Sequence, residues 1–258
     1  MEYHTLTFAQ TDGVAVVTLN RPEKMNALTT QMRAELSYAI TEAGKIARVV
    51  VITGAGQAFC SGQDLGDRVT ATNLDLERTL RDEYAPLIRA ISECPVPTIS
   101  AVNGPAAGAG ANLALAADVV IATKSAYFLQ AFSKIGLIPD AGGTYTLPRT
   151  MGMAKAMGAA LFADKITAQQ ADDWGMIWEG VGDDVFEDHW RSRAQQLASG
   201  PTAAYGAIKS VIRGSWENDF ENQLALEARQ QGICGKTRDF KEGVLAFTEK
   251  RSAKFEGR

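Results

Sequence analysis

The chain reads TISAVNGPAAGAGANL from Thr98 to Leu113. Its first part, Thr98 to Val102, has the length and β-branched apolar character of a buried strand. Very small residues follow, and we expect a helix from Gly110 to about Ala117. A strand that enters such a turn and then a helix leaves backbone N–H groups unpaired at the positive end of the helix dipole. This turn is therefore a candidate site for holding an oxyanion.

A second turn of the same kind lies upstream. The sequence GAGQAFCSGQDL, from Gly54 to Leu65, follows a strand expected over Val49 to Ile52. Its glycines favour a tight turn with bare backbone N–H groups. Two such turns can supply one N–H donor each to the same anion.

Short β-branched runs alternate with helical patterns through most of the chain. We expect strands at Val14–Leu19, Val49–Ile52, Thr98–Val102 and Val119–Ala122, and helices at Gln31–Ala43 and Leu80–Cys94. This alternation predicts an α/β core. From about Gly200 the pattern is helical only, over Ala203–Ile212, Phe220–Ile233 and Phe240–Glu249. We therefore expect a core at residues 1–199 that carries the site, and a C-terminal helical region at residues 200–258.

One acidic residue lies in a segment that shows no pattern of a solvent-exposed face. Asp140 lies in the run PDAGGT, from Pro139 to Thr144, among small and turn-forming residues. It is a candidate for chemistry. The alternative is that its side chain caps a helix that begins near Gly142, because Asp accepts hydrogen bonds from the free N–H groups of a helix start. The residues by themselves leave both interpretations open.

Composition excludes several classes of protein. With 258 residues, of which 46% are apolar, the chain can bury a full core. Its net charge of −4 and its lack of basic runs argue against nucleic acid as a partner. No apolar stretch approaches the roughly 20 residues of a membrane span, and the start lacks the form of a signal peptide, so we expect no membrane contact and a cytoplasmic location. The three widely spaced cysteines indicate neither a disulfide framework nor a metal site.

Four segments, in order, resemble the enoyl-CoA hydratase/isomerase (crotonase) superfamily over nearly the whole chain. They are NRP at 20–22 with NAL at 26–28, FCSGQDL at 59–65, the stretch 103–118, and GLIPDAGGT at 136–144. The resemblance implies a spiral of repeated ββα units followed by a helical region that packs in homotrimers or hexamers. It also implies an acyl-CoA thioester as substrate, with no metal or redox cofactor, since coenzyme A arrives as part of the substrate.

The resemblance also implies roles for particular residues. The thioester oxygen would be held by the backbone N–H groups of Gln63 and Ala109. Hydratases of the family use two glutamates to activate water, and this chain has Asn112 and Phe132 at the matching positions. Asp140 stands where isomerases carry a catalytic aspartate. A single carboxylate facing an enolate suffices to move a proton but not to add water, so an acyl-CoA isomerase is expected.

Further residues are expected to contact the substrate, and among them Lys24, Phe247 and Lys250 match positions that contact coenzyme A in the family. These further residues are Lys24, Ala27, Gly62, Asp64, Leu65, Gly110, Asn112, Phe132, Tyr145, Phe247 and Lys250. Phe132 and Tyr145 lie close to Asp140 in sequence and suit an apolar pocket for an aromatic-derived acyl group. Phe247 and Lys250 match tail positions that often reach the coenzyme A pocket of a neighbouring subunit.

Within the superfamily, four further stretches are similar to the isomerases that convert ring 1,2-epoxyphenylacetyl-CoA into an oxepin thioester in phenylacetate degradation. These stretches are 106–111, 131–140, 174–178 and the tail from 242. Alternatives on the same fold are a Δ3,Δ2-enoyl-CoA isomerase and an enoyl-CoA hydratase acting on linear chains. A non-catalytic CoA-binding scaffold is an alternative of another class, and the carboxylate at Asp140 argues against it.

Overall fold

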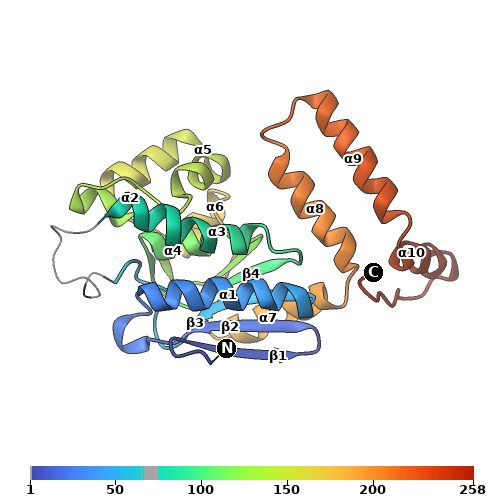
Figure 1. Ribbon diagram of the computed structural model, residues 1–258, viewed down its shortest axis with the longest axis horizontal. Helices are drawn as coiled ribbons and strands as arrows, with labels where there is room; N and C mark the ends of the chain where they lie inside the picture. The colour runs from blue at the N-terminus through green and yellow to red at the C-terminus, as the bar shows by residue number, and fades with distance from the viewer. Residues whose placement is uncertain (1, 65, 67–74) are drawn as a thin grey trace.

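The computed structural model describes residues 2–64, 66 and 75–258 and is an α/β fold built on a main sheet (Figure 1). The strand order in this sheet is β1-β2-β3-β4-β6-β9. The strands are β1 (Leu6–Thr11), β2 (Val14–Leu19), β3 (Val49–Gly54), β4 (Thr98–Val102), β6 (Val119–Thr123) and β9 (Glu179–Val181). Strands β1 and β2 are antiparallel and each later neighbour is parallel. All four strands expected from the sequence are present.

The first four residues of β3 are apolar and buried, because both faces of the strand are covered there. Val49 and Val51 pack against α7 (Phe186–Ala198), whereas Val50 and Ile52 face the larger core that includes α1 (Thr30–Ile46). Parallel strands covered on both faces read as continuous hydrophobic runs. The expected helix at Gln31–Ala43 is thus found with slightly wider bounds.

A smaller sheet and further helices complete the core. The sheet has the order β5-β7-β8, with β5 (Ala106–Ala107), β7 (Tyr127–Leu129) and β8 (Lys165–Thr167). The helices are η1 (Pro22–Lys24), α2 (Leu76–Thr79), α3 (Ala85–Ser92), α4 (Ala109–Leu115), η5 (Ala131–Ile135), α5 (Gly143–Phe162) and α6 (Ala168–Asp173).

The helix expected over Leu80–Cys94 differs from the observed one. Helical structure begins at Leu76 and ends at Ser92, and its middle segment η4 (Leu80–Tyr84) is a π-helix between α2 and α3. The early end has a local reason, because Pro95 disfavours helical geometry in the residue before it. The π-helical turn gave no signal in the apolar spacing.

Helix α4 begins one residue earlier than the sequence suggested, at Ala109. Its second residue must be glycine, since a Cβ on Gly110 would lie 2.4 Å from the carbonyl oxygen of Cys60. This close approach packs the start of α4 directly against the turn that follows β3. The two small-residue turns singled out in the sequence are therefore neighbours in the fold.

The C-terminal arm consists of α8 (Thr202–Gly214), α9 (Phe220–Cys234) and α10 (Arg238–Glu249), and it projects away from the sheet (Figure 1). Asp118 lies just before β6 and holds α8 by ion pairs with Lys209, at 2.7 Å, and Arg213, at 2.9 Å. Many of the arm's large apolar side chains are exposed. Across residues 2–64, 66 and 75–258, the structure contains no helix with the length and apolar character needed to span a bilayer.

Candidate active site

Asp140 lies just before α5 but does not cap it. The residue at the helix start is Gly142, with φ +83°, and no side chain caps this end. The backbone carbonyl of Asp140, rather than its carboxylate, accepts the Gly143 N–H at 2.8 Å. Carboxylate oxygen Oδ1 is buried without a hydrogen-bond partner among the described residues. The capping alternative is therefore wrong, and the carboxylate is left available.

Asp140 is one of the residues that line a cavity of about 420 Å³. The walls are mainly apolar and come from the segment α2–α3 and from residues 137–142, including Leu76, Leu80, Tyr84, Ile88, Leu137 and Ile138. Burial disfavours the charged form of an acid, and it raises the pKa of Asp140 to about 6. A carboxyl group with that pKa can take and return a proton near neutral pH.

A chain of two buried amides holds the backbone of Asp140. Asn112 on α4 donates its Nδ2–H to the carbonyl oxygen of Asp140 at 2.8 Å. Gln130, which is fully buried, donates in turn to Oδ1 of Asn112 at 2.9 Å. Both ends of the Asn112 amide are thus engaged within the protein. The amide of Asn112 therefore supports the main chain of Asp140, and the contact with substrate expected for Asn112 stays a prediction.

The two small-residue turns are joined by main-chain contacts. Cys60 and Ala106 form a parallel β-bridge, and the N–H of Ala107 donates to the Cys60 carbonyl at 2.9 Å. Gly62 has φ +97°, and a Cβ there would lie 2.8 Å from the Ala107 carbonyl and 3.5 Å from the Ala109 nitrogen. Only glycine allows this approach, which brings the turn carrying Gln63 beside the first residue of α4.

The N–H groups of Gln63 and Ala109 have no hydrogen-bond partner within the described part of the chain. Around Gln63, Leu28 donates to the Gly62 carbonyl at 2.8 Å and accepts from the Asp64 N–H at 3.1 Å. Because successive N–H groups of an extended segment point to opposite sides, the Gln63 N–H points away from this bridge. Ala109 is the first residue of α4, so its N–H has no intrahelical acceptor.

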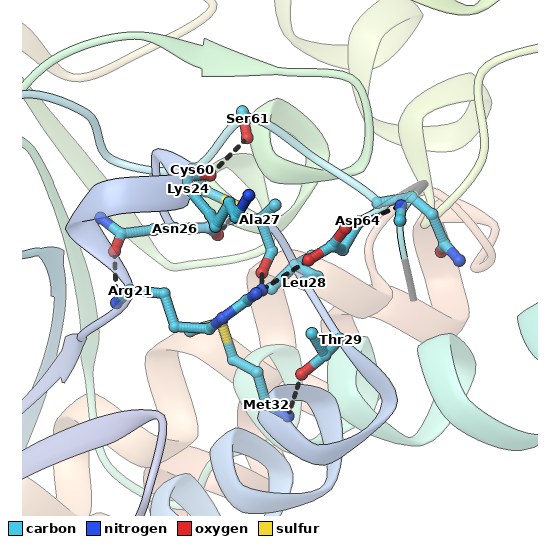
Figure 2. Close-up of polar contacts among 12 residues, drawn as sticks. Arg21, Lys24, Asn26, Ala27, Leu28, Thr29, Met32, Cys60, Ser61 and Asp64 are labelled. Carbon is cyan, nitrogen blue, oxygen red and sulfur yellow. Dashed lines mark hydrogen bonds and ion pairs between the residues drawn. The ribbon is translucent and has the colours of Figure 1, made fainter. Parts of the chain in front are cut away.

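The loop at residues 21–28, whose last three residues are buried, contacts the turn that carries Gln63 (Figure 2). Arg21 reaches the Ala27 carbonyl at 2.7 Å and the Asp64 carboxylate at 2.8 Å. This hydrogen bond from the guanidinium holds the pKa of Asp64 below its ordinary value. Asn26 is fully buried and accepts the Arg21 N–H at 2.9 Å. Lys24 is exposed at the edge of the same loop, while Leu65 falls outside the described residues.

The two aromatic residues expected near Asp140 have different surroundings. Phe132 in η5 is buried, and its ring end lies 3.9 Å from where a Cβ on Gly108 would be, so it sits beside the start of α4. Tyr145 on α5 lies instead in a second cleft next to α8, of about 810 Å³, with the Arg149 guanidinium 3.6 Å from its ring centroid. The structure thus does not bring Tyr145 into the cavity of Asp140.

Phe247 and Lys250 are not brought to the site by their own chain. Phe247 is 86% exposed on α10, and Lys250 follows it in the left-handed conformation that ends the helix. Helix α10 lies at the opposite end of the molecule from α2, which borders the cavity of Asp140 (Figure 1). Any contact of these residues with such a site must therefore be made in another subunit.

The sequence pattern missed three residues that organise the site: Arg33, Tyr84 and Gln130. Arg33 and Tyr84 were part of the helical patterns and carried no motif. Gln130 had no sequence signal, because a polar side chain at a strand end is usually solvated. In the described residues, no group of three or more His, Cys, Asp and Glu side chains is arranged to hold a metal ion.

Comparisons with known proteins agree with this geometry. Residues 9–258 match the family model for enoyl-CoA hydratase/isomerase. The chain is 58% identical, over all of both chains, to a protein from Rhodobacter capsulatus named probable enoyl-CoA hydratase. It is 46% identical to 1,2-epoxyphenylacetyl-CoA isomerase from Escherichia coli, over 95% of this chain and 96% of that one.

Solved structures give the same result for the fold. A crystal structure of an enoyl-CoA hydratase from Bacillus anthracis superimposes with a TM-score of 0.91 at 30% identity, covering 99% of this chain and 100% of that one. The expected crotonase-like fold is therefore confirmed, including its C-terminal helices. The protein belongs to the enoyl-CoA hydratase/isomerase family and is an enzyme that acts on acyl-CoA thioesters.

Proposed function

We propose that this protein is an acyl-CoA isomerase in which Asp140 moves a proton on an enolate. The thioester oxygen accepts hydrogen bonds from the N–H groups of Gln63 and Ala109, which stabilise the negative charge as the α-proton leaves. Asp140 takes that proton and returns it at another carbon of the acyl chain. Coenzyme A enters and leaves as part of the substrate, and no further cofactor takes part in these steps.

The observation that carries this proposal is the environment of Asp140. It is the only carboxylate among the described residues that line its cavity, and its pKa of about 6 suits reversible proton transfer. The positions at which hydratases would need water-activating glutamates hold Asn112 and Phe132. Asn112 has both ends of its amide engaged, and the Phe132 ring is apolar.

The acyl group that we propose is 2-(1,2-epoxy-1,2-dihydrophenyl)acetyl, with a role in phenylacetate catabolism. Two observations support it: the 46% identity to 1,2-epoxyphenylacetyl-CoA isomerase, and a mainly apolar cavity that accommodates a ring. The relative at 58% identity is named as a probable hydratase, so linear 2-enoyl and 3-enoyl thioesters are the competing substrates.

A panel of thioesters tests this choice of acyl group. With equal concentrations of ring-epoxide, linear 3-enoyl and linear 2-enoyl thioesters, we expect the ring epoxide to be consumed with the highest kcat/KM. Preference for the 3-enoyl thioester would replace the proposed substrate while leaving the isomerase chemistry intact. Liquid chromatography that separates each thioester from its isomers shows which one has been consumed, because isomers have equal masses.

We also propose that the protein works as a homotrimer or hexamer. The arm exposes large apolar side chains on all three of its helices, among them Ile212, Leu224 and Phe247. Surface of this kind is usually covered by a partner, and Phe247 with Lys250 would then reach a neighbour's substrate. Sedimentation at micromolar concentration should show one species of three or six subunits. A stable and active monomer would contradict this assembly.

A further inference from the structure

Tyr84 connects the two parts of the candidate site. Its phenolic O–H donates to Oε1 of Gln63 at 2.6 Å, and its ring borders the cavity that holds Asp140. The residue is only 2% exposed, and burial raises the pKa of its phenol, so the group remains a neutral donor under working conditions. Because the hydroxyl is already engaged by Gln63, it acts on that residue rather than on a bound acyl group.

The backbone around Tyr84 is unusual in a way that suits this contact. Tyr84 is the last residue of the π-helix η4, which stands between two α-helical segments. Single π-helical turns inside α-helices occur frequently at functional sites, and they shift the side chains that follow around the helix axis. The Ala85 side chain borders the same cavity, so this turn faces the site.

Arg33 supports the contact between Tyr84 and Gln63. Its side chain is 1% exposed, its Nη1 donates to the Leu28 carbonyl at 2.7 Å, and its guanidinium carbon lies 4.8 Å from the centroid of the Tyr84 ring. It is also paired with Glu83, the neighbour of Tyr84. One buried cation thus ties the π-helical turn to the loop at Leu28, against which the Gln63 segment forms its β-bridge.

We propose that Tyr84 is a positioning residue that, together with Arg33, fixes the Gln63 turn so that the Gln63 N–H is aimed at the substrate's thioester oxygen. The inference rests on the proposed function, in which that N–H is an oxyanion donor. Leu28 and Asp64 restrain the main chain at Gln63 from one side, and Tyr84 restrains its side chain from the cavity side. Oxyanion stabilisation depends on donors that are in place before charge develops, so this restraint affects the rate.

The test is the variant Tyr84→Phe, which removes the hydroxyl and keeps the ring. We expect kcat to fall about tenfold, less than the about 10²–10³-fold loss for removing an oxyanion donor outright. KM should change by no more than about threefold, because an interaction that acts mainly in the transition state lowers kcat and not substrate binding. The exposed Tyr38 of α1 provides a matched control, and Tyr38→Phe should leave both constants unchanged.

A spectroscopic measurement separates positioning from a general loss of stability. In wild-type protein, the carbonyl stretch of bound butyryl-CoA, labelled with carbon-13 at the thioester carbon, should move to lower frequency because two N–H donors polarise the bond. In Tyr84→Phe this shift should be reduced by at least about half, on the premise that a displaced donor polarises less. An unchanged shift and an unchanged kcat in Tyr84→Phe would overturn the inference alone. A wild-type protein without any shift would overturn the proposed function, and the inference with it.

The single variant Gln63→Leu supplies a second measurement that holds even if Tyr84→Phe proves unstable, and a double-mutant cycle adds a third where both variants fold. Gln63→Leu keeps the backbone N–H and removes the side-chain oxygen that accepts from Tyr84 and, at 3.5 Å, from Nη1 of Arg33, so kcat should fall at least as far as in Tyr84→Phe. Because the Tyr84 hydroxyl acts through this same oxygen, the double variant should be no slower than Gln63→Leu alone. Losses of kcat that multiply in the double variant, or a Gln63→Leu variant with wild-type kcat, would overturn the inference.

Discussion

Asp140→Asn is expected to lower the turnover of a 3-enoyl-CoA by about 10²–10⁴-fold, the range for removing a positioned general base. Asparagine is nearly isosteric with aspartate but cannot take a proton. Acyl-CoA binding should stay close to that of wild type, because it depends on contacts of the coenzyme and on backbone donors. Steady-state kinetics, with a binding measurement on each protein, separate the two effects.

The control for this variant is Asp164→Asn, the same change at an exposed position after α5, which should leave kcat unaltered. At pH 7 the free energy of unfolding of Asp140→Asn should be at least as large as that of wild type, because the substitution removes a carboxylate that burial disfavours. An Asp140→Asn protein that keeps more than about a tenth of wild-type turnover, against the range above, would remove Asp140 from its role.

The pH profile of the wild-type enzyme checks the same assignment. Asp140 is a base only when ionised, so kcat/KM should rise with pH through about 6 and then level off. The contribution of Asp140 to the free energy of unfolding should change with pH in the opposite direction. The folded state binds the proton more tightly than the unfolded state, where the pKa is near its ordinary value of 3.8. Asp140 therefore contributes stability below pH 4 that is lost as pH rises to about 6. This loss should be absent from Asp140→Asn.

Isomerisation should exceed hydration by at least about a hundredfold, the lower end of what a missing acid–base group costs. A 3-enoyl-CoA should be converted to its 2-enoyl isomer with partial uptake of deuterium from heavy water. Crotonyl-CoA should gain water at a negligible rate. Hydration requires a water molecule to be held and deprotonated near the β-carbon, and Asp140 is the only carboxylate among the described cavity residues.

Mass spectrometry of the two reactions decides between these activities. Deuterium in the recovered 2-enoyl product, and its absence when Asp140→Asn is used, would agree with proton transfer through Asp140. Rapid formation of the 3-hydroxyacyl product from crotonyl-CoA, persisting in Asp140→Asn, would show a hydratase that does not use this carboxylate. The protein would then share the activity named for its relative from Rhodobacter capsulatus.

The sequence alone determined the elements with strong local signals. Val49–Ile52 is a continuous apolar run because both faces of its strand are covered by core residues, and Thr98–Val102 is a short, fully buried strand with β-branched residues. The turns at Gly62 and Gly108 were visible because positive φ angles and close approaches require very small residues. Asp140 stood out because its neighbours in sequence are small, turn-forming residues without the charged pattern of a solvent-exposed face. Each of these signals lies within about ten neighbouring residues.

Only the tertiary structure decided how these parts meet. It showed that the Asp140 carboxylate does not cap α5 and that Tyr145 lies in a different cleft. It also showed that the Asn112 side chain donates a hydrogen bond to the main-chain carbonyl of Asp140. It also revealed the contact between Tyr84 and Gln63. Hydrogen bonds between residues far apart in the chain depend on how helices and turns pack, and they leave no periodic trace in the sequence. The candidate carboxylate could therefore be found by reading the chain, whereas the side chains that hold its backbone and the Gln63 turn in place became visible only in the packed molecule.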